Sequence, residues 1–377
     1  MKFAISISFF VFGLFGAFAQ ISNVTEEFPL PLSLSESSGI IYLNGKLITH
    51  NDSGGNDNKL YEVDLVSELV TRTVTISNAQ NVDWEDITQD YTSIYIGDIG
   101  NNVSGNRTDL KIYKISKSDY LSMDTVTAEI ISFSYSDQTD FTAKSANNTE
   151  WDAEALVSYD ASNLIVFTKN WVNGITKGYL VSKTPGDYDL PPLATPLNSG
   201  GLITGGTYNP FTGKLYLVGY TNPTLQPFVW KIEDFSGSDV FSGTKTSTSL
   251  YSTFGMEQAE AITYVNANSY LMTSESFNVS IFSDVAKVMA FNTNDATLSS
   301  QTVIKQNDTL PYPNPVSSFL NVKNDAIDSI EIYDIKSVQL YKGTNTRVDM
   351  STLSKGVYVV KINFKDQTSQ LKKLVKN

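Results

Sequence analysis

The sequence predicts an all-β protein in which one module is repeated around a central axis. Tyrosine and phenylalanine are abundant, with 20 of each, and such residues favour strands. From about residue 21 to residue 305, short apolar runs alternate with turns rich in Gly, Asn, Asp and Ser. These runs recur in the same order, about four to a module, as expected for the blades of a β-propeller.

The module begins with a signature that is clearest at residues 83–87, Asp-Trp-Glu-Asp-Ile, before an apolar strand at 94–98. Four weaker copies start near residues 36, 153, 204 and 259. When the modules are aligned on their apolar residues, one column contains Ser38, Glu85, Glu154, Thr204 and Glu260. The repeat count predicts five blades, with a sixth degenerate blade as the alternative. Residues 26–34 are expected to supply the closing strand of the last blade.

Composition excludes several classes of chemistry. The chain contains no cysteine and one histidine, so disulfides, thiol nucleophiles and multi-histidine metal sites are ruled out. No haem, nucleotide or zinc site is indicated. The formal charge is −13, and an acidic body is the wrong surface for nucleic acid. A metal would have to be held by oxygen, which favours calcium or magnesium.

The chain divides into four segments. Residues 1–19 contain a charged start, an apolar run and an Ala-Phe-Ala end, which predicts a secretory signal peptide, with a membrane anchor as the alternative. No later segment is apolar enough to span a bilayer. The propeller is expected over residues 20–305 and a linker over 306–310. A smaller β-sandwich domain is expected over 311–377, where ten basic residues outnumber six acidic ones.

The last segment opens with Tyr-Pro-Asn-Pro, contains Gly-Val-Tyr and ends with Lys-Lys-Leu-Val-Lys. It closely resembles the type A C-terminal sorting domain of the type IX secretion system of Bacteroidota. The resemblance implies passage through the outer membrane by way of the type IX machinery, and a protein that is secreted or held on the surface. A β-sandwich with a binding role is the alternative. The residues that carry the resemblance are Tyr312, Pro313, Asn314, Pro315, Gly356, Tyr358, Lys372 and Lys373.

The propeller segment also resembles a known group of proteins. Its motifs at residues 51–54, 83–87, 97–102, 152–156, 204–206 and 260–262, together with Arg107, are similar to those of a family of bacterial secreted propeller-like proteins. The similarity covers roughly residues 36–292. It implies the fold and no reaction.

Acidic residues at the starts of the first strands are candidate metal ligands. The first strands of propeller blades line the central channel, so these carboxylates are expected to converge. Converging carboxylates repel one another, and a hard cation such as Ca²⁺ relieves that repulsion. The alternative is that they cap turns or accept backbone N–H bonds between blades. The candidates are Glu36, Glu85, Asp86, Glu154 and Glu260.

Loops at the ends of the second strands supply further candidates. They are rich in oxygen ligands and in residues that tolerate turns, but they do not match an EF-hand loop. Turn capping is the alternative for the acids and amides, and pairing with a neighbouring acid is the alternative for the arginine. The candidate residues for a ligand pocket are Asn51, Asp52, Asp98, Asn101, Arg107 and Glu275.

Two classes of function follow from these patterns. The first is a non-catalytic module that binds a ligand, a glycan or a surface partner and contains an axial calcium site. The second is a calcium-dependent hydrolase of phosphoesters or esters that uses the axial carboxylates. Propellers support both. The sequence does not decide whether the protein is an enzyme, and it names neither a catalytic residue nor a ligand.

Overall fold

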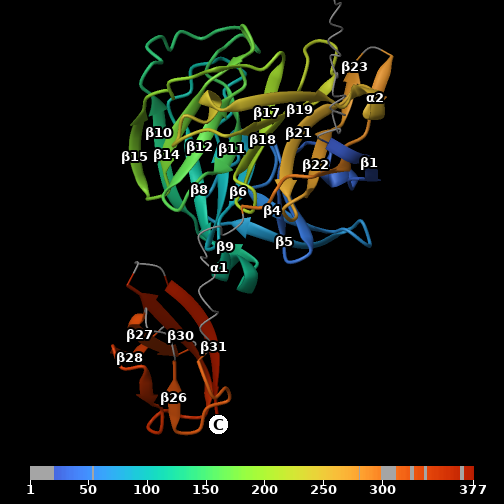
Figure 1. Cartoon of the computed structure of the whole chain (residues 1–377). Helices are drawn as coiled ribbons and strands as arrows, with labels where there is room; N and C mark the ends of the chain where they lie inside the picture. Colours follow the sequence, from blue (N-terminus) through green and yellow to red (C-terminus); the bar gives the residue numbers. More distant parts are fainter. Residues whose placement is uncertain are drawn as a thin grey trace, which may run out of the picture. The chain divides into compact units, whose positions relative to one another are not determined.

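The computed structural model describes residues 21–52, 55–279, 281–298, 311–322, 327–334, 338–365 and 369–377. The expected signal peptide and the linker at 306–310 lie outside these residues. The chain forms two compact units, residues 1–298 and 299–377, which are drawn in Figure 1.

The first unit is a five-bladed β-propeller, as the repeat count predicts. The innermost strands of the blades are β2 (Ser37–Leu43), β6 (Trp84–Gln89), β11 (Ala153–Ser158), β17 (Leu202–Asn209) and β21 (Gln258–Tyr264). Each inner strand contacts the next, and β21 contacts β2, which closes the ring. The described residues contain no sixth blade.

The remaining strands of each blade pair outwards from its inner strand. The first blade adds β3 (Lys46–Asn51), β4 (Lys59–Asp64), β5 (Val70–Ile76) and β9 (Thr125–Val126). The second adds β7 (Ser93–Asp98), β8 (Lys111–Ser116), β10 (Glu129–Tyr135) and β15 (Gly186–Leu190). The third adds β12 (Asn163–Thr168) and β14 (Gly178–Ser182). The fourth adds β18 (Lys214–Tyr220), β19 (Pro227–Glu233) and β20 (Thr244–Ser249).

The fifth blade joins the two ends of the propeller. Its strands after β21 are β22 (Ser269–Glu275), β25 (Lys287–Thr293) and the N-terminal β1 (Ile21–Pro29). Figure 1 shows blue β1 and orange β22 in this blade, and β25 lies between them and pairs antiparallel with both. The expected closing strand is therefore present, and its pairing begins at Ile21 rather than at residue 26. This pairing ties the start of the ring to its end.

Short elements decorate the blades. Two small pairs are β13 (Ile175–Thr176) with β16 (Leu197–Asn198), and β23 (Phe277–Val279) with β24 (Phe282–Asp284). The helices are η1 (Leu32–Leu34), α1 (Lys117–Ser122), η2 (Val240–Ser242) and α2 (Tyr251–Phe254). All are short, and the core consists of apolar strand residues packed between neighbouring blades. Trp84, for example, is fully buried in a cluster with Ile48 of the first blade and Tyr113 of the second.

Every inner strand contains a β-bulge at the same place. The pairing with the second strand shifts between Ser37 and Gly39, Trp84 and Ile87, Ala153 and Ala155, Ile203 and Gly205, and Ala259 and Ala261. A bulge leaves one residue unpaired and turns its side chain. The residues inside these shifts include the column identified in the sequence: Ser38, Glu85, Glu154, Thr204 and Glu260.

The second unit is a small β-sandwich. One sheet pairs β26 (Phe319–Asn321) with β29 (Arg347–Asp349), and the other has the order β28 (Gln339–Gly343), β27 (Ile327–Asp334), β30 (Gly356–Phe364) and β31 (Ser369–Lys376). The Asn314 amide donates to the Lys373 carbonyl at 2.9 Å, and its Oδ1 accepts from the Val375 N–H at 2.9 Å. The Tyr-Pro-Asn-Pro motif therefore holds the terminal basic strand.

Candidate functional site

A polar cavity of about 190 Å³ lies where the inner strands begin. Two columns of residues build it. Ser38, Glu85, Glu154 and Glu260 come from the bulges of the inner strands. Asp52, Lys169, Tyr220 and Glu275 lie where the second strands end, each one residue past the partner of the residue that precedes the bulge. Asn102, Asn147, Trp171 and Gln258 complete the wall. We call this the axial cavity.

The axial cavity concentrates negative charge away from water. Five carboxyl groups line it, against one lysine. Burial raises the pKa of Glu85 well above its usual value, and the charges of Asp52 and Glu154 add to the effect. Burial also raises the pKa of Glu260 to about 7 and that of nearby Asp83 to about 7. Removing so many carboxylates from water favours either their protonation or a bound cation.

Two groups of carboxyl oxygens lie close enough together to share an ion. Asp52, Asp83 and Glu85 form the first, and Glu85, Asp152 and Glu154 form the second, with the oxygens of each group within 4.8 Å of one another. Glu85 belongs to both. Its side chain is only 2 % exposed, and its Oε1 is buried without a hydrogen-bond partner among the described residues. A buried carboxylate oxygen without a partner is costly, and an oxygen-seeking cation would satisfy it.

Gly100 lets two of these carboxylates come together. A Cβ built on Gly100 would lie 2.1 Å from Glu85 Oε1 and 2.4 Å from Asp83 Oδ2. No side chain other than hydrogen fits there, and the Gly100 N–H also donates to the Asp83 carbonyl at 3.1 Å. The need for glycine at this position is therefore steric.

Lys169 balances part of the charge. Its Nζ donates to Glu154 Oε2 at 2.6 Å, and both side chains are buried. The same ammonium lies 4.9 Å from the ring centre of Trp171 and 5.4 Å from that of Tyr220, which are cation–π distances. The surrounding carboxylates, Glu154 first, raise the pKa of Lys169 against the effect of burial, so that it stays protonated.

Two of the five candidate calcium ligands lie outside the wall of the axial cavity. Asp86 is fully buried, and its Oδ2 accepts the N–H groups of Leu156 at 2.9 Å and Gly206 at 3.1 Å in the third and fourth blades. Asp86 therefore connects three inner strands by accepting backbone N–H bonds between blades, which is the role that the sequence offered as the alternative to metal binding. Glu36 is exposed and accepts a hydrogen bond from the Asn56 amide at 2.5 Å.

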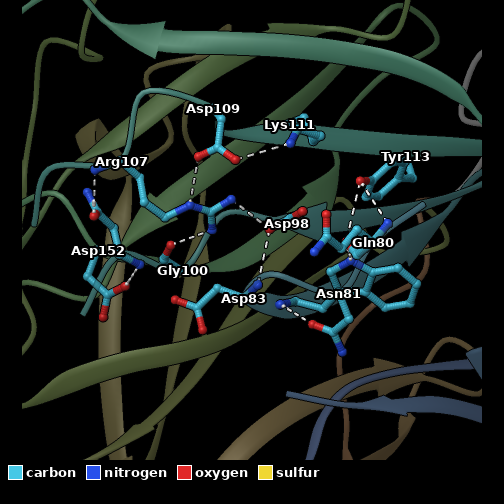
Figure 2. Close-up of polar contacts among 12 residues, drawn as sticks. Gln80, Asn81, Asp83, Asp98, Gly100, Arg107, Asp109, Lys111, Tyr113 and Asp152 are labelled. Atoms are coloured by element: carbon cyan, nitrogen blue, oxygen red, sulfur yellow. Dashed lines mark hydrogen bonds and ion pairs between the residues drawn. The ribbon is translucent and has the colours of Figure 1, made fainter. Parts of the chain in front are cut away.

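Most of the candidate pocket residues on the loops serve the fold. Figure 2 shows Arg107 bonded to Asp98, Asp109 and the Gly100 carbonyl, at 2.8, 3.0 and 2.7 Å. Asn101 donates its backbone N–H to Asp152 at 2.6 Å and accepts the Arg107 N–H at 3.0 Å. This network braces the loop that contains Gly100. Asn101 and Arg107 also line a separate hollow of about 490 Å³.

Two of the three remaining candidates, Asp52 and Glu275, line the axial cavity. Glu275 accepts from the Gln258 amide at 3.3 Å. Asn51 does not line it, and its amide donates to the Ser33 carbonyl at 2.8 Å.

Sequence reasoning did not assign Asp83, Asp152, Lys169 or Tyr220 to the site. A signal for two of them was present, because Asp52, Lys169, Tyr220 and Glu275 occupy one position relative to the bulges. Alignment of the second strands would have found that column. Trp171 enters from the following loop, where the modules differ in length.

No helix among the described residues is long and apolar enough to cross a membrane. No curated protein matches the chain. Three of the solved structures that resemble it are hydrazine synthase from Kuenenia stuttgartiensis, GH43 endo-arabinanase from Bacillus licheniformis and GH32 β-fructofuranosidase from Bombyx mori. Their identities to this chain are 12 %, 12 % and 8 %, and their TM-scores are 0.34, 0.39 and 0.40.

The alignments cover 94 %, 68 % and 94 % of this chain and 99 %, 94 % and 89 % of the other chains, in the same order. These scores are too low to bear on function, and the five-bladed architecture rests on this chain's own strand pairing.

The C-terminal unit has a direct family match. Residues 311–377 match the family described as secretion system C-terminal sorting domain. The match begins at the Tyr-Pro-Asn-Pro entry and runs through the basic terminal strand. It confirms the resemblance seen in the sequence, and it places the protein outside the cell, on the surface or secreted. The C-terminal unit therefore belongs to the sorting domains of the type IX secretion system, which direct a protein to the cell surface or the medium.

Proposed function

We propose that the propeller is an exported binding module whose axial cavity holds a calcium ion. The observation that supports this most is Glu85 Oε1, a buried carboxylate oxygen without a hydrogen-bond partner among the described residues, in a cavity lined by four other carboxyl groups. Calcium is bound by six to eight oxygens in adaptable geometry. The candidate ligands are Asp52, Asp83, Glu85, Asp152 and Glu154. The cavity, at about 190 Å³, also has room for water or a small oxygen-bearing group.

Calcium titration of the purified mature protein tests this proposal. A ligand that binds only the folded state at 100 times its Kd stabilises it by about 2.7 kcal/mol. In a domain of this size that corresponds to a rise in Tm of roughly 5–10 °C. We expect Tm to rise with calcium concentration above an EDTA baseline, and isothermal titration calorimetry to detect binding. A flat Tm and no heat of binding would make the carboxyl groups structural.

Glu85→Gln is the decisive variant, because it keeps the shape of the side chain and removes the charge. It should abolish most of the calcium-dependent rise in Tm. Glu257→Gln is the matched control. Glu257 is also fully buried and its Oε2 also has no hydrogen-bond partner among the described residues, but its Oε1 is paired with the Lys287 ammonium at 2.7 Å, so its charge is balanced without a cation. It should lower Tm equally in EDTA and in calcium.

A second candidate is a hydrolase of phosphoesters or esters, and Lys169 favours it. This ammonium lines the same cavity as the carboxyl groups, so it could hold a substrate's phosphoryl or acyl oxygen while a carboxylate orients water. Bound calcium would supply electrophilic polarisation. Screening phosphoester and ester substrates with and without calcium tests this candidate. Turnover that survives in Glu154→Gln and Lys169→Met would assign the activity to something else.

A further inference from the structure

The inner strands have a second end, opposite the axial cavity, and a larger cavity lies there. Its volume is about 710 Å³. Residues from all five turns that join an inner strand to the second strand of its blade line it. A pocket of this size can hold a ligand of a few sugar rings or another molecule of drug-like size. We call it the turn cavity.

Aromatic rings from these turns and the adjoining strand ends dominate the turn cavity. Tyr159 and Tyr208 meet edge to face with ring centres 5.5 Å apart, and Phe211 and Tyr264 do so at 6.0 Å. Tyr91 is 96 % exposed and Phe211 is 52 % exposed. The other four rings are half-buried, and two exposed rings beside them around one hollow indicate a binding surface. The six rings are Tyr42, Tyr91, Tyr159, Tyr208, Phe211 and Tyr264.

The acidic groups of the turn cavity already have partners. Asp90 Oδ2 accepts from Lys183 Nζ at 2.9 Å and from the Tyr95 hydroxyl at 2.8 Å. Lys183 donates as well to Ser158 Oγ and to the Asp160 carbonyl, so all three N–H groups of its ammonium are used. The Asp160 carboxylate accepts the N–H groups of the turn that follows it, from Ser162 at 2.7 Å and Asn163 at 2.8 Å. These contacts fix the shape of the wall.

Lys117 is different. Among the described residues that line the turn cavity, Lys117 is the one charged residue whose side chain makes neither a hydrogen bond nor an ion pair. It is half-buried at the start of α1, and burial lowers its pKa while the charge of Asp90 raises it. Gln89 adds an acceptor, because its amide donates to the Tyr42 carbonyl at 2.7 Å while its Oε1 is buried without a partner.

We propose that the turn cavity binds an oligosaccharide that contains a carboxylated sugar. A sugar ring has an apolar C–H face that packs on an aromatic ring, and tyrosine adds a polar edge. A sugar carboxylate would pair with Lys117, and a hydroxyl would donate to Gln89 Oε1. A purely apolar partner would leave both polar groups unsatisfied at a cost. The site does not depend on calcium, because it shares no residue with the axial cavity.

Calorimetry with defined oligosaccharides tests the site on the full mature protein. The probes are oligogalacturonate, oligomannuronate and glucuronate-substituted xylo-oligosaccharide, each beside a neutral oligosaccharide of the same length. We expect an acidic probe to bind at least tenfold more tightly than its neutral counterpart. Lys117→Ala should remove that preference, and Tyr91→Ala should weaken binding several-fold. Tyr251→Ala, which changes an exposed tyrosine on α2, is the control and should bind normally.

Binding of an acidic probe should persist in EDTA and in Glu85→Gln, so a failure of the calcium proposal would leave this one intact. Each of the following results would overturn it: no binding of any acidic probe, equal binding of acidic and neutral probes, or affinity that neither Lys117→Ala nor Tyr91→Ala changes. Loss of binding in EDTA would also overturn it, because it would move the ligand to the axial cavity.

Discussion

Gly100→Ala adds one methyl group where two carboxylates meet. The new Cβ would lie 2.1 Å from Glu85 Oε1 and 2.4 Å from Asp83 Oδ2, so both side chains must move. Forcing a methyl group into a packed site costs about 1–3 kcal/mol, which lowers Tm by roughly 2–12 °C in a domain of this size. Displaced ligands or their supports weaken metal binding about 10–100-fold. The calcium-dependent stabilisation should therefore fall by about 1.4–2.7 kcal/mol at a fixed calcium concentration.

Thermal unfolding in EDTA and across a calcium series measures both effects. Gly206→Ala, on the inner strand β17 of the fourth blade, is the matched control. Its Cβ would lie 2.8 Å from Leu217 Cδ2 and 2.9 Å from Val157 Cγ1, so it crowds apolar atoms only. The control should lower Tm and leave the response to calcium unchanged. A Gly100→Ala protein with the wild-type response to calcium would refute the idea that Glu85 and Asp83 hold the ion.

Three further predictions concern Glu260, Asp86 and the C-terminal sorting domain. In EDTA, Tm should fall as pH rises from about 4.5 to about 7. Burial raises the pKa of Glu260 in the folded protein from 4.5 to about 7. The protonated carboxyl group therefore stabilises the fold below pH 4.5, and this stability is lost as the group ionises. For Glu260 that loss is on the order of 3 kcal/mol, and Glu260→Gln should flatten the curve. Asp86→Ala removes the acceptor of two interblade N–H groups and should destabilise the fold by about 2–5 kcal/mol, as measured by urea unfolding. Deletion of residues 311–377 should stop export, as measured by immunoblotting of the medium and cell fractions.

Each of these predictions has a clear contrary result. A Tm in EDTA that rises between pH 5 and 7 would show that the ionised carboxyl groups stabilise the fold without a cation. An Asp86→Ala protein whose calcium response is lost, rather than merely shifted to lower temperature, would make Asp86 a ligand. Normal export of the shortened chain would place the export signal elsewhere.

The sequence alone determined the architecture. Repeats are a local property, since each blade has its own strands and turns, and five signatures therefore predicted five blades. The N-terminal closing strand was foreseen as well, because a ring of blades leaves one outer position for it. The sorting domain could be recognised because its motif residues lie at fixed places along the chain, and the structure shows that Asn314 binds the basic strand.

Only the tertiary structure decided what each acidic residue does. Glu85 and Asp86 are neighbours in sequence, but the bulge turns Glu85 into the axial cavity while Asp86 reaches the backbone of two other blades. Lys169 joins the same cavity from a second strand, where it pairs with Glu154. The turn cavity is assembled from five turns far apart in the chain. Pairing shifts and ring closure bring these groups together in space, and the spacing of residues along one chain does not encode which way a bulged side chain points.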